Sequence, residues 1–177
     1  MEKEKIKVTS QQLGQVLFVF VLTTVTNSLK NKEVLEDLGV EKMDKNSLFR
    51  EMIIINMFAT IQQFQGMLND GNLENEVLDY MHEAYYKNLI EQLNFSKEQV
   101  TEERFHVLKR YREYSGAMKE KKGPNWLWPL SDRMLNNLRH EETKDAIAMA
   151  YLTTIFSELM VVLPEMISKY EIVKNWN

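Results

Sequence analysis

Three stretches of the chain are apolar around most of their circumference when they are wound as helices. They cover Val16–Val25, Met52–Ile61 and Ala146–Leu163. A helix that is apolar on every side belongs inside a core rather than at its edge. The β-branched residues of the first stretch would also suit a buried strand, but no second convincing strand exists to pair with it. The pattern therefore predicts three nearly fully buried helices.

The remaining helical segments are amphipathic, and two of the expected helix starts carry clear local signals. Thr9 with Gln12, and Ser96 with Gln99, have the spacing of a capping box. Apolar side chains recurring at helical spacing predict helices over Leu73–Leu93 and from Ser96 to about Lys122. In the second of these, the expected buried arc contains Val100, Val107, Leu108, Tyr111, Tyr114 and Met118.

Glycine and proline mark where the expected helices end. A helix from about Ser47 to Asn69 should stop at Asp70-Gly71-Asn72, with Gly71 left-handed and Asn72 capping the next helix. The segment Gly123–Pro129 predicts a loop, and a helix is expected to begin at Ser131.

The last apolar helix contains a proline near its end. Pro164 should kink or end this helix, because proline removes one backbone hydrogen bond and clashes with the preceding turn. A final helical segment is expected to extend to Val173.

Together these elements predict an all-α fold with a single domain over residues 1–177. The expected architecture is a compact, globular bundle of six to eight helices, three of them nearly fully buried. In a plain four-helix bundle every helix keeps one wet face. Three helices that are apolar on every side instead indicate either a layered helical fold or a large dimer interface.

Composition and charge narrow the function classes. The chain has 177 residues, no cysteine and a formal net charge of −4. Without cysteine, disulfides, thiolate nucleophiles and zinc–cysteine sites are excluded. The acidic balance argues against a protein that binds duplex nucleic acid, which usually shows a basic footprint.

The N-terminal segment superficially resembles a signal peptide, because charged residues precede the apolar run Val16–Val25. The small-residue cleavage signature is missing, since Thr26-Asn27-Ser28 follows. The run is also shorter than the roughly 20 apolar residues of a membrane span. We therefore expect a cytoplasmic protein with no transmembrane segment.

Two histidines lie near carboxylates at helical spacing. Glu103 and His106 match the Glu-x-x-His spacing of di-iron bundles, but a rotation of about 100° per residue points His106 away from the apolar arc. This pair is expected on a solvated face. Asp79 and His82 predict a half-buried histidine paired with the aspartate, and a metal ligand shared between helices is the alternative.

Two further polar positions are weaker candidates. Arg133 and His140 lie seven apart on one helix face, a pattern seen in some helical nucleases, and a plain polar face is the expected interpretation. Glu158 interrupts an apolar run; a solvated outer face is the preferred interpretation, and an interface, an ion pair or a polar pocket is the alternative. No cofactor, metal site or catalytic residue is predicted.

The segment Trp126-Leu127-Trp128 between two prolines is the most unusual in the chain. In an extended stretch the two indoles point the same way. Trp126 and Trp128 are therefore the candidate binding residues, as a contact loop for another protein. The interpretation preferred to this contact loop is a lid whose indoles are buried over one end of the bundle.

Three function hypotheses follow. The first is a non-catalytic helical protein that acts through protein contacts and self-associates, as its surplus of dry helix surface indicates. The second is a helical sensor or carrier with an internal apolar pocket, for which 11 methionines supply adaptable lining. The third is a metal-binding or nuclease-like helical enzyme built on His82, His106 or His140.

Overall fold

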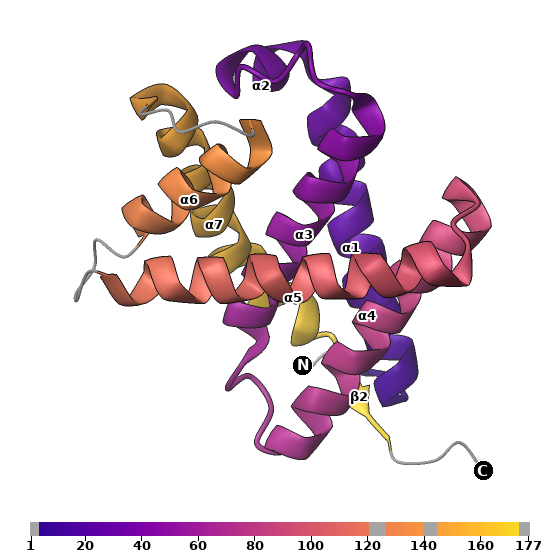
Figure 1. The fold of residues 1–177 in the computed structure, drawn as a ribbon. Coiled ribbons are helices and arrows are strands. Elements are labelled where there is room, and N and C mark those ends of the chain that lie inside the picture. The colour runs from indigo at the N-terminus through magenta and orange to yellow at the C-terminus, as the bar shows by residue number, and fades with distance from the viewer. Residues whose placement is uncertain (1–3, 121–126, 140–144, 174–177) are drawn as a thin grey trace.

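The computed structural model describes residues 4–120, 127–139 and 145–173, and within them the fold is all-α, as expected (Figure 1). Two three-residue strands accompany the helices. In chain order the elements are β1 (Ile6–Val8), α1 (Ser10–Lys30), α2 (Lys32–Asp37), α3 (Lys45–Phe64), α4 (Gly71–Leu93), α5 (Lys97–Glu120), α6 (Leu127–Arg139), α7 (Ala146–Ile167) and β2 (Tyr170–Ile172).

Helix α3 is the centre of the fold. It contacts α1, α7, α6 and α5, while α1 packs most extensively along α4. In Figure 1, α5 runs crosswise to α1 and α3. Every residue from Glu51 to Thr60 of α3 is buried, which confirms the expected central helix.

The other two apolar helices are not buried all round, which corrects the prediction of three dry helices. Helix α1 buries one side, including Leu13, Leu17 and Val21, while Val19 is 58% exposed. Helix α7 buries its α3-facing side, while Val161 is 70% exposed. The reason is geometric: α1 and α7 both pack against α3, and their outer sides have no helix to cover them among the described residues.

Capping side chains explain where most helices begin. The capping box of Thr9 and Gln12 is present, and Ser96 exchanges the corresponding hydrogen bonds with Gln99. Aspartates cap three further helices: Asp44, Asp70 and Asp145.

Three expected boundaries are wrong. Helix α3 ends at Phe64, and the left-handed glycine beyond it is Gly66 (φ 85°) rather than Gly71. Asp70, not Asn72, caps α4, because its carboxylate reaches two backbone N–H groups. Helix α6 begins at Leu127 rather than Ser131, so part of the expected loop is helical; Pro129 is tolerated there because N–H groups of a first turn have no intrahelical partner.

The ends of the described chain pair as a short parallel ribbon. Ile6 lies opposite Tyr170 and Val8 opposite Ile172, so β2 replaces the helical segment expected to reach Val173. Pro164 lies inside α7, which continues to Ile167 and then ends. The ribbon brings the start of α1 close to the end of α7.

Candidate functional site

The outer sides of α1 and α7 form a surface that is apolar and almost free of charge. Between Ser10 and Leu29 the chain has no Asp, Glu, Lys or Arg, and from Ala146 to Pro164 it has only Glu158. We call this surface the α1–α7 face and define it by Val19, Phe20, Thr23, Ile147, Thr154, Val161 and Val162. Its α7 stripe follows from spacing, because Ile147, Thr154 and Val161 are seven apart. An exposed surface of this kind typically marks an interaction site.

A groove runs between the two helices within this face. It is a hollow of about 200 Å³, with walls from both helices. Its lining residues are Phe20, Thr24, Ser28, Tyr151, Ile155, Glu158, Leu159 and Val162. The groove opens on the surface, so it is not the closed internal pocket of the carrier hypothesis.

By length and composition alone, α1 and α7 also qualify as candidate membrane spans among the described residues. Both helices have more than 18 residues, and 33% of the apolar stretch of α1 and 39% of that of α7 are buried within the fold. The apolar helices are therefore longer than the run Val16–Val25 suggests. A core helix of a soluble protein passes the same test, so a cytoplasmic location stays a prediction.

The second candidate site is a cluster of buried polar side chains where α5 crosses the start of α3. The Arg50 guanidinium donates to Glu103, whose side chain is fully buried. Tyr85 of α4 donates its hydroxyl to the other oxygen of Glu103 at 2.6 Å. Glu103 therefore ties three helices together, because each of its carboxylate oxygens has a partner.

The neighbouring residue of α3 anchors a second ion pair. Glu51 accepts from Arg110 Nη2 at 2.8 Å and Nε at 3.1 Å, a bidentate contact. It also lies 2.8 Å from His106 Nε2. Burial raises the pKa of the Glu51 carboxyl, but hydrogen bonds from His106 and Arg110 lower it more, and the net pKa is lowered. Arg110 also contacts Glu113, which accepts from Asn137 of α6.

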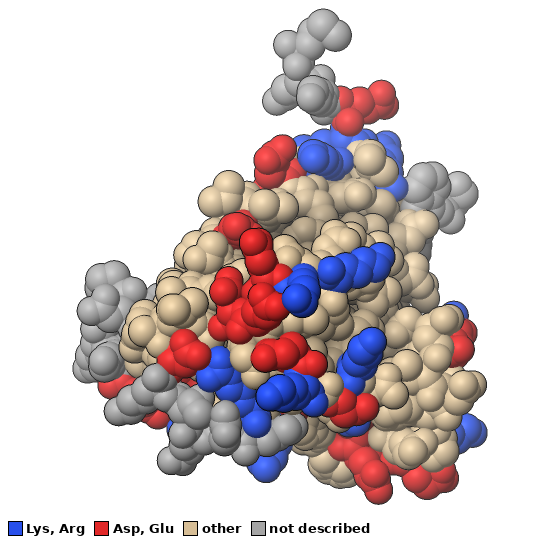
Figure 2. Space-filling model, turned by 90° about the horizontal axis from the view of Figure 1, so that it is seen from above, with Lys and Arg blue, Asp and Glu red and all other residues tan. Residues whose placement is uncertain are grey.

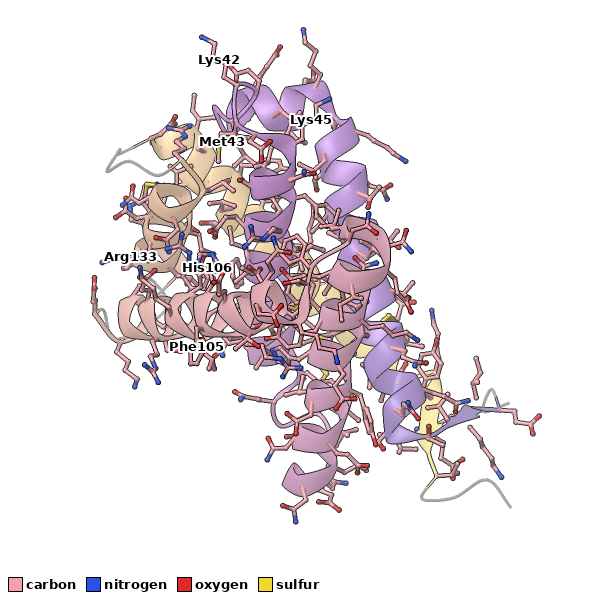
Figure 3. All side chains as sticks on the ribbon, turned by 45° about the vertical axis from the view of Figure 1, so that its right-hand side comes forward. Lys42, Met43, Lys45, Phe105, His106 and Arg133 are labelled. Atoms are coloured by element: carbon pink, nitrogen blue, oxygen red, sulfur yellow. The ribbon has the colours of Figure 1, made fainter. Side chains whose placement is uncertain are left out.

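This arrangement corrects the expectation that Glu103 and His106 lie on a solvated face. Glu103 is 1% exposed and the His106 side chain 31% exposed. Figure 3 places Phe105 and His106 on different sides of α5. The buried side of α5 carries Glu103 and Arg110 among its apolar residues, while Leu108, expected inside, is 52% exposed.

The cluster contains carboxylate, guanidinium and imidazole side chains. A hollow of about 230 Å³ opens beside it, lined by Arg50, Phe95, Gln99, Glu102, Glu103 and His106. The lining contains an oriented imidazole but no Ser, Thr or Cys as a nucleophile. Within the described residues no group of three or more His, Asp or Glu is placed to hold a metal ion. The hydrogen bonds and ion pairs of the cluster link α5 to α3 and α4.

His82 is largely buried between α4 and α5. Its Nδ1 lies 2.7 Å from the Leu78 carbonyl oxygen and its Nε2 lies 3.1 Å from the Tyr111 hydroxyl. The expected pairing with Asp79 is not a hydrogen bond; the aspartate acts only through its charge. Burial lowers the pKa of His82, and the Leu78 carbonyl and Asp79 oppose this only in part.

This lowered pKa predicts an acid-sensitive fold. An unfolded histidine takes up a proton below about pH 6.5, whereas His82 stays neutral in the folded state. The free energy of unfolding should therefore decrease as the pH falls from about 6.5 toward the folded pKa, by up to about 1.4 kcal/mol per pH unit. Urea unfolding of wild type and His82→Gln over this range measures it. Parallel pH profiles for the two proteins would contradict the prediction.

The remaining candidates lie at the surface or outside the described residues. Trp128 is 44% exposed in the first turn of α6, and Trp126 lies outside the described residues. A contact role for these two residues stays a prediction. Arg133 is exposed (Figure 3), and His140 is also outside the described residues. Glu158 is exposed, in agreement with a solvated outer face, and it also lines the groove between α1 and α7.

Surface charge gives no sign of a nucleic-acid interface in the view of Figure 2. Acidic and basic side chains intermingle there, and neither sign covers the face.

The α1–α7 face was not predicted from the sequence, because a helix that is apolar on every side was interpreted as buried. The absence of charged residues along α1 is the signal that points to this face.

Comparison with protein-family models, with curated proteins and with solved structures finds no match.

Proposed function

We propose that the protein is a non-catalytic helical protein that acts through protein contacts and self-associates through the α1–α7 face. The observation that carries this proposal is the exposure of large apolar side chains on an uncharged surface: Val19 is 58%, Ile147 69% and Val161 70% exposed. Leaving such side chains in water is unfavourable by about 25 cal/mol per Å² of apolar surface.

The size of the face suits a dimer. A helix of about 20 residues is about 30 Å long and 10 Å wide, so two such helices present roughly 600 Å². Stable interfaces bury about 800 Å² per partner, a comparable area.

The lack of charge favours a second copy of this chain as the partner. In a twofold dimer the same patch faces itself, so any charge on it meets the same charge or is buried. A face with one carboxylate avoids most of this repulsion. A strongly charged partner would find little on this face to pair with.

Size-exclusion chromatography with light scattering over a concentration series tests the proposal. Wild type should be a dimer at high concentration, and Val161→Glu should weaken dimerisation by at least about tenfold, because each interface would bury two added charges. Phe105→Glu is the matched control, since Phe105 is 69% exposed but lies on α5. It should dimerise like wild type.

Three results would contradict self-association through this face. One is a wild type that stays monomeric at every concentration. Another is loss of the dimer in Phe105→Glu with retention in Val161→Glu. The third is a monomer that instead binds lipid vesicles through α1 and α7, which would favour a membrane-associated protein.

A further inference from the structure

We infer that the groove between α1 and α7 binds a small hydrophobic cation, an amine or ammonium group attached to a compact apolar body. This inference goes beyond self-association. Every residue that lines the groove belongs to one chain, and because Phe20 and Val162 are also part of the α1–α7 face, the cation is expected to bind the monomer and to compete with the dimer. It rests on the arrangement of apolar walls around one carboxylate.

The walls of the groove suit an apolar body. Phe20 of α1 and Ile155, Leu159 and Val162 of α7 contribute side chains to it. The hollow of about 200 Å³ is of the order of a small ring compound. Binding there would remove apolar surface of both partners from water.

The polar groups of the groove suit a cationic head. Glu158 and Tyr151 lie seven apart on α7 and both line the groove, together with Ser28 of α1. Glu158 is the single charged residue in the lining, and no Lys or Arg contributes to it. Tyr151 also contributes an aromatic side chain to the lining, and aromatic rings attract cations.

The charges that act on Tyr151 also favour a cationic ligand. Burial raises the pKa of its hydroxyl, a hydrogen bond with Ser28 lowers it, and the charges of Glu158 and Asp37 raise it further. Two carboxylates therefore act on this end of the groove. An anionic ligand of the same shape would be repelled, and a cationic one attracted.

We commit to a free small molecule rather than a lysine from a partner protein. The groove has apolar walls on both helices, and a lysine carries only a single four-carbon stem to fill them. A broader apolar body would contact the apolar side chains of both walls.

Two probes of nearly identical shape and opposite charge test the inference. Phenethylamine should bind, as followed by chemical-shift perturbation of α1 and α7 amides at a protein concentration where light scattering finds monomer, and phenylpropionate should not. Glu158→Gln should weaken amine binding about tenfold, which corresponds to the loss of a charge-assisted hydrogen bond. Circular dichroism confirms that the variant is folded, as expected for a change at an exposed residue.

Glu165→Gln is the matched control. Glu165 is on the same helix with a side chain that is 76% exposed, but it does not line the groove, so amine affinity should be unchanged. Absence of amine binding, equal binding of phenylpropionate, or wild-type affinity in Glu158→Gln would each overturn the inference.

Discussion

Replacing Glu51 with alanine is expected to lower the free energy of unfolding by about 3–5 kcal/mol. The Arg110 side chain is 9% exposed and contacts Glu51 through two nitrogens. Without the carboxylate, a guanidinium would remain buried without its main partner, and His106 would lose its contact too. Urea unfolding followed by circular dichroism near neutral pH measures the loss.

Two further variants test this explanation. Glu51→Met with Arg110→Met should recover most of the lost stability, because an apolar pair of similar volume can replace a buried ion pair. Lys87→Ala removes an exposed pair with Glu91, whose side chains are 72% and 54% exposed, and should change stability by less than about 1 kcal/mol. A Glu51→Ala variant that is as stable as Lys87→Ala would show that the cluster does not hold the fold.

Features encoded within a few residues could be predicted from the sequence. The capping boxes at Thr9 and Ser96 are present because both partners of each hydrogen bond lie within one turn. The helical state of Val16–Val25 and the central position of α3 were also predicted correctly. These predictions need only the local spacing of polar and apolar residues.

Features that depend on distant partners were not predictable in the same way. Glu103 pairs with Arg50, which lies 53 residues earlier in the chain, and Arg110 pairs with Glu51, which lies 59 residues earlier. Rotation around the α5 axis points His106 away from the apolar arc, and on that basis the pair of Glu103 and His106 was expected on a solvated face. Their spacing with Arg110 and Glu113 along one side of α5 was the available signal.

The α1–α7 face shows a different limit. A helix that is apolar on every side is expected to be shielded from water. This pattern does not indicate whether another part of the chain, a second copy or a ligand covers it. Helix α3 and helix α7 have similar sequence patterns, yet Ile54 is fully buried and Val161 is 70% exposed. The difference lies in the packing: other helices surround α3, whereas no helix covers the outer side of α7 among the described residues.

The position of α1 depends on a glycine, and Gly14→Ala is expected to destabilise the fold by about 3 kcal/mol, the upper end for overpacking. A Cβ at this position would lie 2.5 Å from Tyr80 Cβ and 2.6 Å from the Val77 carbonyl oxygen. The carbonyl belongs to the α4 backbone and cannot rotate away, so α1 would have to move off α4. Thermal and urea unfolding measure the loss.

Gly116→Ala gives the opposite expectation in the same protein. Gly116 is exposed on α5 and a Cβ there would meet nothing within 4 Å, so alanine should stabilise the fold by up to about 1 kcal/mol through helix propensity. Because α1 also carries half of the α1–α7 face, a displaced α1 should weaken self-association in Gly14→Ala and leave it intact in Gly116→Ala. If Gly14→Ala is as stable as Gly116→Ala, the close contact between α1 and α4 is wrong. The position of α1 in the α1–α7 face would then be wrong too.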